Sequence, residues 1–180
     1  MRHSGTTLTE LLVVMGIAGI LLGIGVPSYR YVTNSNRMSS EVNALLGDMQ
    51  YTRSEALREG RNVVICISSN GTSCAGATTN TWQSGWIVFS DVNGDGTLSG
   101  SDSVLRVQKT LSGTDVFRDG AGTLTQVSFN REGFAIGLPN AGSLLVLRDS
   151  SANQAWTRCL SLTLVGMLTT QTHATNSSCS

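Results

Sequence analysis

The stretch GTTLTELLVVMGIAGILLGIGVPSY, residues 5–29, places one carboxylate, Glu10, at the edge of a long apolar run. Residues 11–29 contain no charged side chain, and residues 11–26 are all Leu, Val, Ile, Met, Gly or Ala. A membrane-crossing helix needs about 20 mostly apolar residues, and residues 6–10 complete that length. Because a carboxylate in hydrocarbon costs about 2.5 to 3.5 kcal/mol, Glu10 indicates a function.

A cleaved secretory signal peptide is the alternative interpretation of this segment. The residues before the run, Met1–Gly5, carry one firm positive charge, and the run is longer than the apolar region of an ordinary signal peptide. It ends in Val26 and Pro27 where a signal peptide would have a pair of small residues. We therefore expect the apolar segment to stay in the protein.

The apolar pattern changes after Pro27 and continues as one face of a helix. Its apolar residues recur mostly at steps of three and four, the period of a helix; they are Val32, Met38, Val42, Leu45, Leu46, Met49, Ala56 and Leu57. The pattern predicts one helix from near Thr7 to Glu59, membrane-borne over residues 6–29 and amphipathic over residues 30–60. Pro27 lacks a backbone donor and predicts a bend or local unwinding, and Gly60 predicts the end of the helix.

Beyond Gly60 the sequence changes to short β-branched and apolar runs separated by turn residues. The apolar stretch Cys159–Leu168 has too few residues to span a bilayer and is predicted to form a central strand. No second helical pattern follows, so we expect residues 61–180 to form a mainly antiparallel β head packed on the amphipathic helix, an α+β fold. The expected strands are Arg61–Ser68, Gly85–Ser90, Val104–Gln108, Thr123–Asn130, Gly133–Gly137, Ser143–Arg148 and Trp156–Leu164.

The charge distribution argues against nucleic acid as a partner. The 180 residues suit one domain with an appendage, and the 13% of charged residues sum to zero, so no overall field attracts a polyanion. Beyond Arg158 there is no Lys or Arg to neutralise phosphates. The other basic residues of the head are expected to be solvated loop or strand-edge charges; among them are Arg106, Lys109, Arg118, Arg131 and Arg148.

No set of residues suggests catalysis. His3 and His173 are the two histidines, and the chain has neither a GxSxG nucleophile elbow nor an HExxH helix. We therefore expect no enzyme activity and no small-molecule substrate. The tryptophans favour packing in a core or at its rim over a ligand-stacking surface; they are Trp82, Trp86 and Trp156.

Four cysteines fall into two local pairs, Cys66 with Cys74 and Cys159 with Cys179. Four cysteines allow three connectivities, and the spacing favours these two local disulfides because each closes a modest loop. Free buried thiols are the alternative, and a metal site is disfavoured by the wide spacing and the scarcity of histidine. Disulfides imply an oxidising compartment.

The segment DVNGDGTLSGSD, residues 91–102, fits the pattern of a calcium-binding loop. Gly96 stands at the sharp turn, and the candidate ligands are Asp91, Asn93, Asp95, the carbonyl of Thr97, and Asp102. A strand precedes the segment where a helix is usual, and Asp at the last position is less often bidentate than Glu. A polar β-hairpin turn is the alternative, and calcium is the one cofactor that the sequence suggests.

Residues 5–29 resemble the N-terminus of type IV pilins and of the pseudopilins of type II secretion systems. The matching features are a very short leader that ends at Gly5, a Glu at the fifth place after it, the apolar run and Pro27. Further along, four segments resemble the minor pilins and pseudopilins of the FimT/FimU and GspH family, namely MSSEVNALLGDMQYTRSEALREGRNVVIC, GTSC, WQSGWIVFSDVNGDG and VSFNREGFA. The cysteine placement is also similar and supports the local pairing.

The resemblance implies a pilin fold and a leader, residues 1–5, that a prepilin peptidase removes between Gly5 and Thr6, with methylation of the new N-terminus. Thr6 stands where the family usually has Phe. It further implies a single pass through the bacterial inner membrane, with the head in the periplasm until the subunit joins a filament. In that filament, the carboxylate of Glu10 pairs with the N-terminal amine of a neighbouring subunit.

The function that the resemblance implies is that of a structural minor pilin, which helps to start or cap a type IV pilus together with other pilin subunits. A minor pseudopilin of a type II secretion system is the alternative. A DNA-capturing pilin is disfavoured. The members of the family that bind DNA carry a basic C-terminal stretch, whereas this chain has the uncharged VGMLTTQTHATNSS there.

Overall fold

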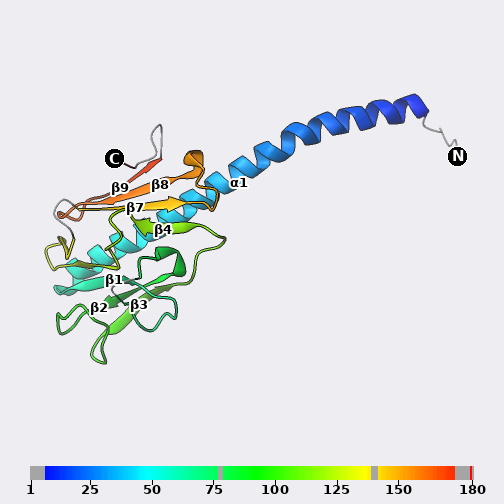
Figure 1. Ribbon diagram of the computed structural model, residues 1–180. Helices are drawn as coiled ribbons and strands as arrows, with labels where there is room; N and C mark the ends of the chain where they lie inside the picture. The colour runs from blue at the N-terminus through cyan, green and yellow to red at the C-terminus, as the bar shows by residue number, and fades with distance from the viewer. Residues whose placement is uncertain (1–6, 77–78, 139–141, 173–178, 180) are drawn as a thin grey trace. The chain divides into compact units, whose positions relative to one another are not determined.

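The computed structural model describes residues 7–76, 79–138, 142–172 and 179. In these residues one long helix, α1 (Leu8–Glu59), precedes nine strands and two short 3-10 helices (Figure 1). The strands are β1 (Val63–Ile67), β2 (Trp86–Ser90), β3 (Ser103–Gln108), β4 (Val116–Asp119), β5 (Gln126–Phe129), β6 (Ala135–Ile136), β7 (Ser143–Arg148), β8 (Arg158–Leu162) and β9 (Leu168–Thr172). The short helices are η1 (Trp82–Ser84) and η2 (Gln154–Trp156).

Helix α1 has the predicted limits, and local capping explains both. At its start, the hydroxyl of Thr7 accepts a hydrogen bond from the backbone N–H of Glu10 at 3.3 Å, the geometry of an N-cap. At its end, Gly60 takes a left-handed conformation with φ of 68° and donates its N–H to the carbonyl of Ala56 at 3.0 Å.

Of the bend or local unwinding expected at Pro27, the unwinding is not observed, because α1 remains helical through that residue; the bend stays a prediction. A proline inside a helix removes one hydrogen bond and crowds the carbonyl four residues earlier. Here that carbonyl belongs to Gly23, and neither Gly23 nor Gly25 has a neighbour within 4 Å of where a Cβ would stand. Outside the helix's own backbone, no described residue therefore crowds these two positions.

The chain divides into two compact units, residues 1–37 and residues 38–180. In the second unit, α1 buries one face at helical spacing, which confirms the amphipathic prediction for most of its positions: Met38, Val42, Leu45, Met49 and Ala56. Two residues assigned to that face, Val32 and Leu57, are instead 51% and 53% exposed.

The strands form two antiparallel sheets, which confirms the α+β prediction. Sheet A has the strand order β3-β2-β1-β5-β6, and sheet B has the order β4-β7-β8-β9. Both sheets contribute to one core with the helix, through Ile65 and Val88 of sheet A and Leu145 and Leu160 of sheet B. The division into two sheets was not expected from the sequence.

Sheet B differs most from the prediction. Strands β4 and β9 were not expected, because VFRD is short and LTTQT has one apolar residue, so neither shows the alternation of a half-buried strand. Strand β8 lies in the interior of the sheet as predicted, but it ends at Leu162. The residues that follow make a turn in which Gly166 donates its N–H to Thr163.

Each sheet also carries a disulfide on the face turned away from the core. On sheet A, Cys66 bonds to Cys74 with a Cα–Cα distance of 5.6 Å, and a second buried cluster of Val64, Cys66, Ile87 and Phe89 lies on this face. On sheet B, Cys159 alternates with the core residues of β8 and bonds to Cys179 with a Cα–Cα distance of 5.9 Å. The disulfides therefore fix Cys74 and Cys179 at the outer faces of the two sheets.

Candidate functional site: an apolar helix and the surfaces of the head

The first half of α1 is an apolar rod whose side chains have no partner in the described part of the chain. Twelve large apolar residues between Leu8 and Val26 are 46% to 79% exposed. Five of them are consecutive, residues 11–15, so they occupy every side of the helix. A helix that is apolar all round requires a membrane or a protein core around it.

The length of this segment suits a bilayer. The 19 residues from Leu8 to Val26 extend about 28 Å as a helix, close to the roughly 30 Å of a hydrocarbon core. By length and composition α1 is able to cross a membrane, with a mean hydropathy of 2.3 over its most apolar window. Membrane anchoring by this helix, with a separate folded head, is the arrangement that these observations indicate.

Glu10 lies in the first turn of α1, and its side chain is exposed. Its backbone N–H is bound by Thr7, and an acidic residue at this position also suits the positive end of the helix dipole, an effect of about 0.3 to 1 kcal/mol. A role in starting its own helix is therefore an alternative to a role between subunits. Gly5 and Thr6, the predicted cleavage site, lie outside the described residues.

The loop of residues 91–102 connects β2 and β3, which pair as an antiparallel hairpin with Ser90 opposite Ser103. Its carboxylates bind the backbone of the loop itself. Asp91, which is 2% exposed, accepts the N–H groups of Gly94 at 2.8 Å and Gly96 at 2.9 Å. Asp102 accepts the N–H groups of Val92 at 2.9 Å and Ser99 at 2.7 Å.

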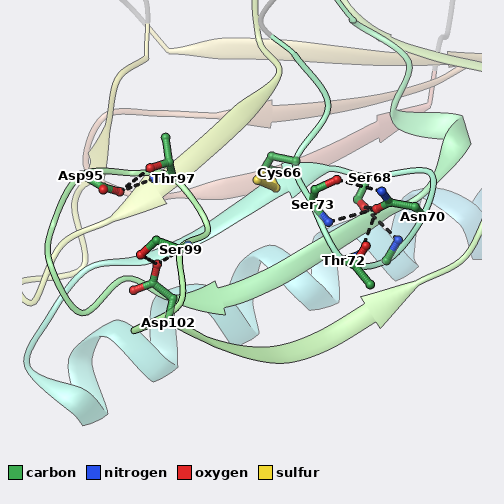
Figure 2. Close-up of a disulfide and its surroundings, with 11 residues drawn as sticks. Cys66, Ser68, Asn70, Thr72, Ser73, Asp95, Thr97, Ser99 and Asp102 are labelled. Atoms are coloured by element: carbon green, nitrogen blue, oxygen red, sulfur yellow. Dashed lines mark hydrogen bonds between the residues drawn. A yellow bond between two sulfur atoms is a disulfide. The ribbon is translucent and has the colours of Figure 1, made fainter.

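These hydrogen bonds favour the ionised form of two of the carboxylates. The hydroxyl of Thr97, aided by its backbone N–H, lowers the pKa of Asp95, and the backbone N–H of Val92 is the main cause that lowers the pKa of Asp102. Figure 2 shows Asp95, Thr97 and Asp102 in one view with the Cys66 disulfide. Leu98, in the same loop, packs on the outer cluster of sheet A, so the loop covers part of that sheet.

The hairpin interpretation accounts for this loop without a metal. Among the described residues, no three or more His, Cys, Asp or Glu side chains are grouped so that they could hold a metal ion. Each carboxylate oxygen of Asp91 and Asp102 has a second lone pair, so these backbone hydrogen bonds do not exclude an ion. Calcium binding at Asp91, Asn93, Asp95, Thr97 and Asp102 stays a prediction that this geometry does not favour.

The head contains a polar cluster that the sequence did not reveal. The carboxylate of Asp48 on α1 accepts hydrogen bonds from the indole N–H of Trp86 and from Arg106, each at 2.8 Å. The guanidinium of Arg106 also lies 3.7 Å from the centre of the Tyr51 ring. Arg106, expected to be a solvated charge, thus joins β3 to the helix, and Asp48 raises its pKa. The sequence signal was the spacing of three between Asp48 and Tyr51, which places both on one side of a helix.

A second arginine, Arg53 on α1, binds the turn between β8 and β9. It donates to the carbonyl of Gly166 at 2.9 Å and to that of Val165 at 3.3 Å. Beside it lies a groove of about 600 Å³ between α1 and this turn, lined in part by Leu57, Val165 and Met167. These three side chains are 53% to 58% exposed, so the groove has an apolar rim and a basic group in its wall.

The tryptophans are part of the core and offer no stacking surface. Trp82 and Trp86 are fully buried, and Trp156 is partly buried against the same core. The indole N–H of Trp82 donates to the carbonyl of Leu124 at 3.0 Å. His173 lies outside the described residues.

Comparison with known proteins gives one family and two informative structures. A family profile described as "Type II transport protein GspH" matches residues 41–166. The type IV minor pilin FimU of Pseudomonas aeruginosa is similar with a TM-score of 0.59 and 18% identity, over 78% of this chain and 92% of that one. The minor pseudopilin EpsH of the type 2 secretion system of Vibrio cholerae is similar with a TM-score of 0.53 and 10% identity, over 76% and 97%. No curated protein sequence matches. At these identities the two structures show the fold alone.

Proposed function

This chain belongs to the GspH family of type II transport proteins, and on that premise we propose that it is a structural minor subunit of a type IV pilus that helps to start or cap the filament. The observation that carries the proposal is the exposed apolar rod of residues 8–26. Such a surface suits first a lipid bilayer and then a filament core, where neighbouring helices replace the lipid. The β head then contacts other pilin-family subunits.

Processing between Gly5 and Thr6 gives Glu10 its role in this proposal. Cleavage creates an amine at Thr6, and in a low-dielectric filament core the Glu10 carboxylate of one subunit neutralises the amine of the next. Breaking a buried ion pair by removing one partner costs about 3 to 5 kcal/mol, because the remaining charge is left unpaired. The pair therefore favours subunits that are in register. A prepilin peptidase is the enzyme whose cleavage produces the Thr6 amine of this pair.

A minor pseudopilin of a type II secretion system is the second candidate, and the description of the matching family favours it. The two candidate functions need the same structural parts, since a subunit of either filament has an apolar helix and a β head. Deleting the gene separates the two, because loss of surface pili and their motility supports the first function and loss of protein secretion supports the second.

Intact mass and N-terminal sequencing of the membrane-extracted protein test the shared part of the proposal. We expect a chain that begins at a methylated Thr6, located in the inner membrane with its head in the periplasm and recovered in part with sheared filaments. A chain that retains Met1 in assembled filaments would contradict the processing step and the pairing that depends on it.

A further inference from the structure

We propose that β9 is a docking edge, where an extended segment of another pilin-family subunit adds to sheet B and places an acidic and an apolar side chain at the groove beside Arg53. This inference rests on the proposed function, since it assumes assembly with such subunits. It names the surface of the head that makes the contact and the chemistry that the partner must supply.

Three of the four edge strands are protected against pairing with another chain. On β4, the N–H of Phe117 binds the side chain of Gln83, and Asp119 exchanges two backbone hydrogen bonds with the side chain of Asn80. Strand β6 has two residues, and the N–H of Ala135 donates to the carbonyl of Leu164. Strand β3 carries Arg106 and a register shift opposite β2. Short strands, bulges and charges are the usual means of blocking an edge.

Strand β9 has none of these devices. Its five residues, LTTQT, carry no charge and no proline, and they pair with β8 without a register shift. Leu168 is partly buried, and residues 169–172 are exposed. It is the last strand in the order β4-β7-β8-β9, so among the described residues one of its edges has no neighbouring strand, and Figure 1 shows it as the outermost strand of sheet B. Unpaired main-chain donors and acceptors in this arrangement fit an incoming extended segment.

The groove at the start of β9 adds specificity to this edge. Leu168, the first residue of β9, lines the groove together with Val165, Met167 and Leu57. A segment paired with β9 would therefore bring a side chain to a site of about 600 Å³ with an apolar rim. In strand addition, main-chain hydrogen bonds supply affinity and such pockets select the side chain.

Arg53 indicates that the partner segment is acidic. Among the described residues its hydrogen bonds go to carbonyl oxygens, those of Val165 and Gly166, so its charge has no carboxylate to neutralise it. An Asp or Glu in the incoming segment would do so with charge-assisted hydrogen bonds. A second copy of β9 has no acidic residue to offer, and the charge therefore favours a different subunit over a β9–β9 dimer.

Site-specific photocrosslinking of the full-length protein in its native membranes tests the proposal. A photoreactive residue is placed at Thr170 on β9, and the matched control position is Ser101, which is exposed in the loop before β3. We expect Thr170, and not Ser101, to crosslink to a second chain that has a prepilin-type N-terminus, at a segment that contains Asp or Glu. Arg53→Gln should reduce this product about tenfold, as expected for the loss of one charge-assisted contact.

The same experiment separates failure of this inference from failure of the proposed function. Absence of a product at Thr170, or a product formed with another copy of β9, overturns the docking edge even when the protein is found in filaments. A second readout guards against misfolding, because Arg53→Gln must leave the protein level and the Cys159–Cys179 disulfide unchanged. Absence of the protein from every filament fraction overturns the proposed function itself.

Discussion

Replacing Glu10 by Gln separates the two roles that its position on α1 allows. In the first turn, Glu10 both suits the helix start and offers a charge to a neighbouring subunit. Gln retains the shape and suits the same capping position, but it carries no charge. We therefore predict that Glu10→Gln blocks incorporation into filaments nearly as strongly as Glu10→Ala, while Thr7→Ala, which removes the capping hydroxyl, has a small effect.

The expected magnitudes differ enough to be distinguished. The hydroxyl of Thr7 accepts a hydrogen bond from the N–H of Glu10 at 3.3 Å, and loss of an N-cap costs about 1 kcal/mol, or roughly fivefold in forming the first turn. Removing one member of a buried ion pair costs about 3 to 5 kcal/mol, at least about a hundredfold in the incorporation equilibrium. The charge effect should therefore dominate.

The assay measures the ratio of the protein in sheared filaments to the protein in membranes, by quantitative immunoblotting, for the wild type and the three variants. Near-ultraviolet circular dichroism of each purified variant checks that the head is intact. If Glu10→Gln entered filaments normally and Thr7→Ala did not, Glu10 would serve its own helix, and the reasoning about subunit pairing would be refuted.

Three further predictions concern the head. Asp48→Ala leaves the buried indole N–H of Trp86 unpaired and should lower the free energy of unfolding by about 2 kcal/mol. Denaturant titration of the detergent-solubilised chain measures this change. The control is Glu132→Ala, which breaks the exposed pair with Arg131 and should change the free energy of unfolding by less than about 0.5 kcal/mol. Gly85→Ala should lower the free energy of unfolding by about 1 to 3 kcal/mol, because φ at Gly85 is 105° and the new Cβ would meet the carbonyl of Gln108. Gly100→Ala is the control, since a Cβ there would stand in open space. Thermal unfolding of both variants should show a loss of stability for Gly85→Ala and no change for Gly100→Ala. The folded-state pKa values of Asp95 and Asp102 are lowered, so their contribution to loop stability is complete above their ordinary value and is lost as the pH falls through the lowered values. The protection of the amides of residues 91–102, measured as the ratio of the intrinsic to the observed exchange rate at each pH, should fall over that range. Greater protection of the same amides on adding calcium at neutral pH would support the ion that the loop pattern suggests.

The limits of α1 could be predicted from the sequence because the signals that define them are local. Its apolar run, the three- and four-residue spacing that follows and the glycine at its end act over one to four residues, so α1 was predicted within one residue at its start and at its observed end. The sequence left open whether Pro27 bends or unwinds the helix, because it shows the lost hydrogen bond and not how the preceding turn responds; the structure shows that α1 stays helical there.

The sheets and surfaces depended on contacts between distant residues. LTTQT becomes strand β9 because β8 supplies its hydrogen-bond partners, and no local pattern encodes that pairing. No local sequence pattern distinguishes the contacts of Arg106 from those of Arg53. Arg106 binds Asp48, 58 positions away, and Arg53 binds the carbonyl of Gly166, 113 positions away. The sequence by itself determined the apolar anchor, its carboxylate and the α+β class, because these follow from local period and composition. Only the tertiary structure decided, for the described residues, that β9 is an edge of sheet B and that Arg53 binds carbonyl oxygens, because both follow from what the rest of the chain brings next to them.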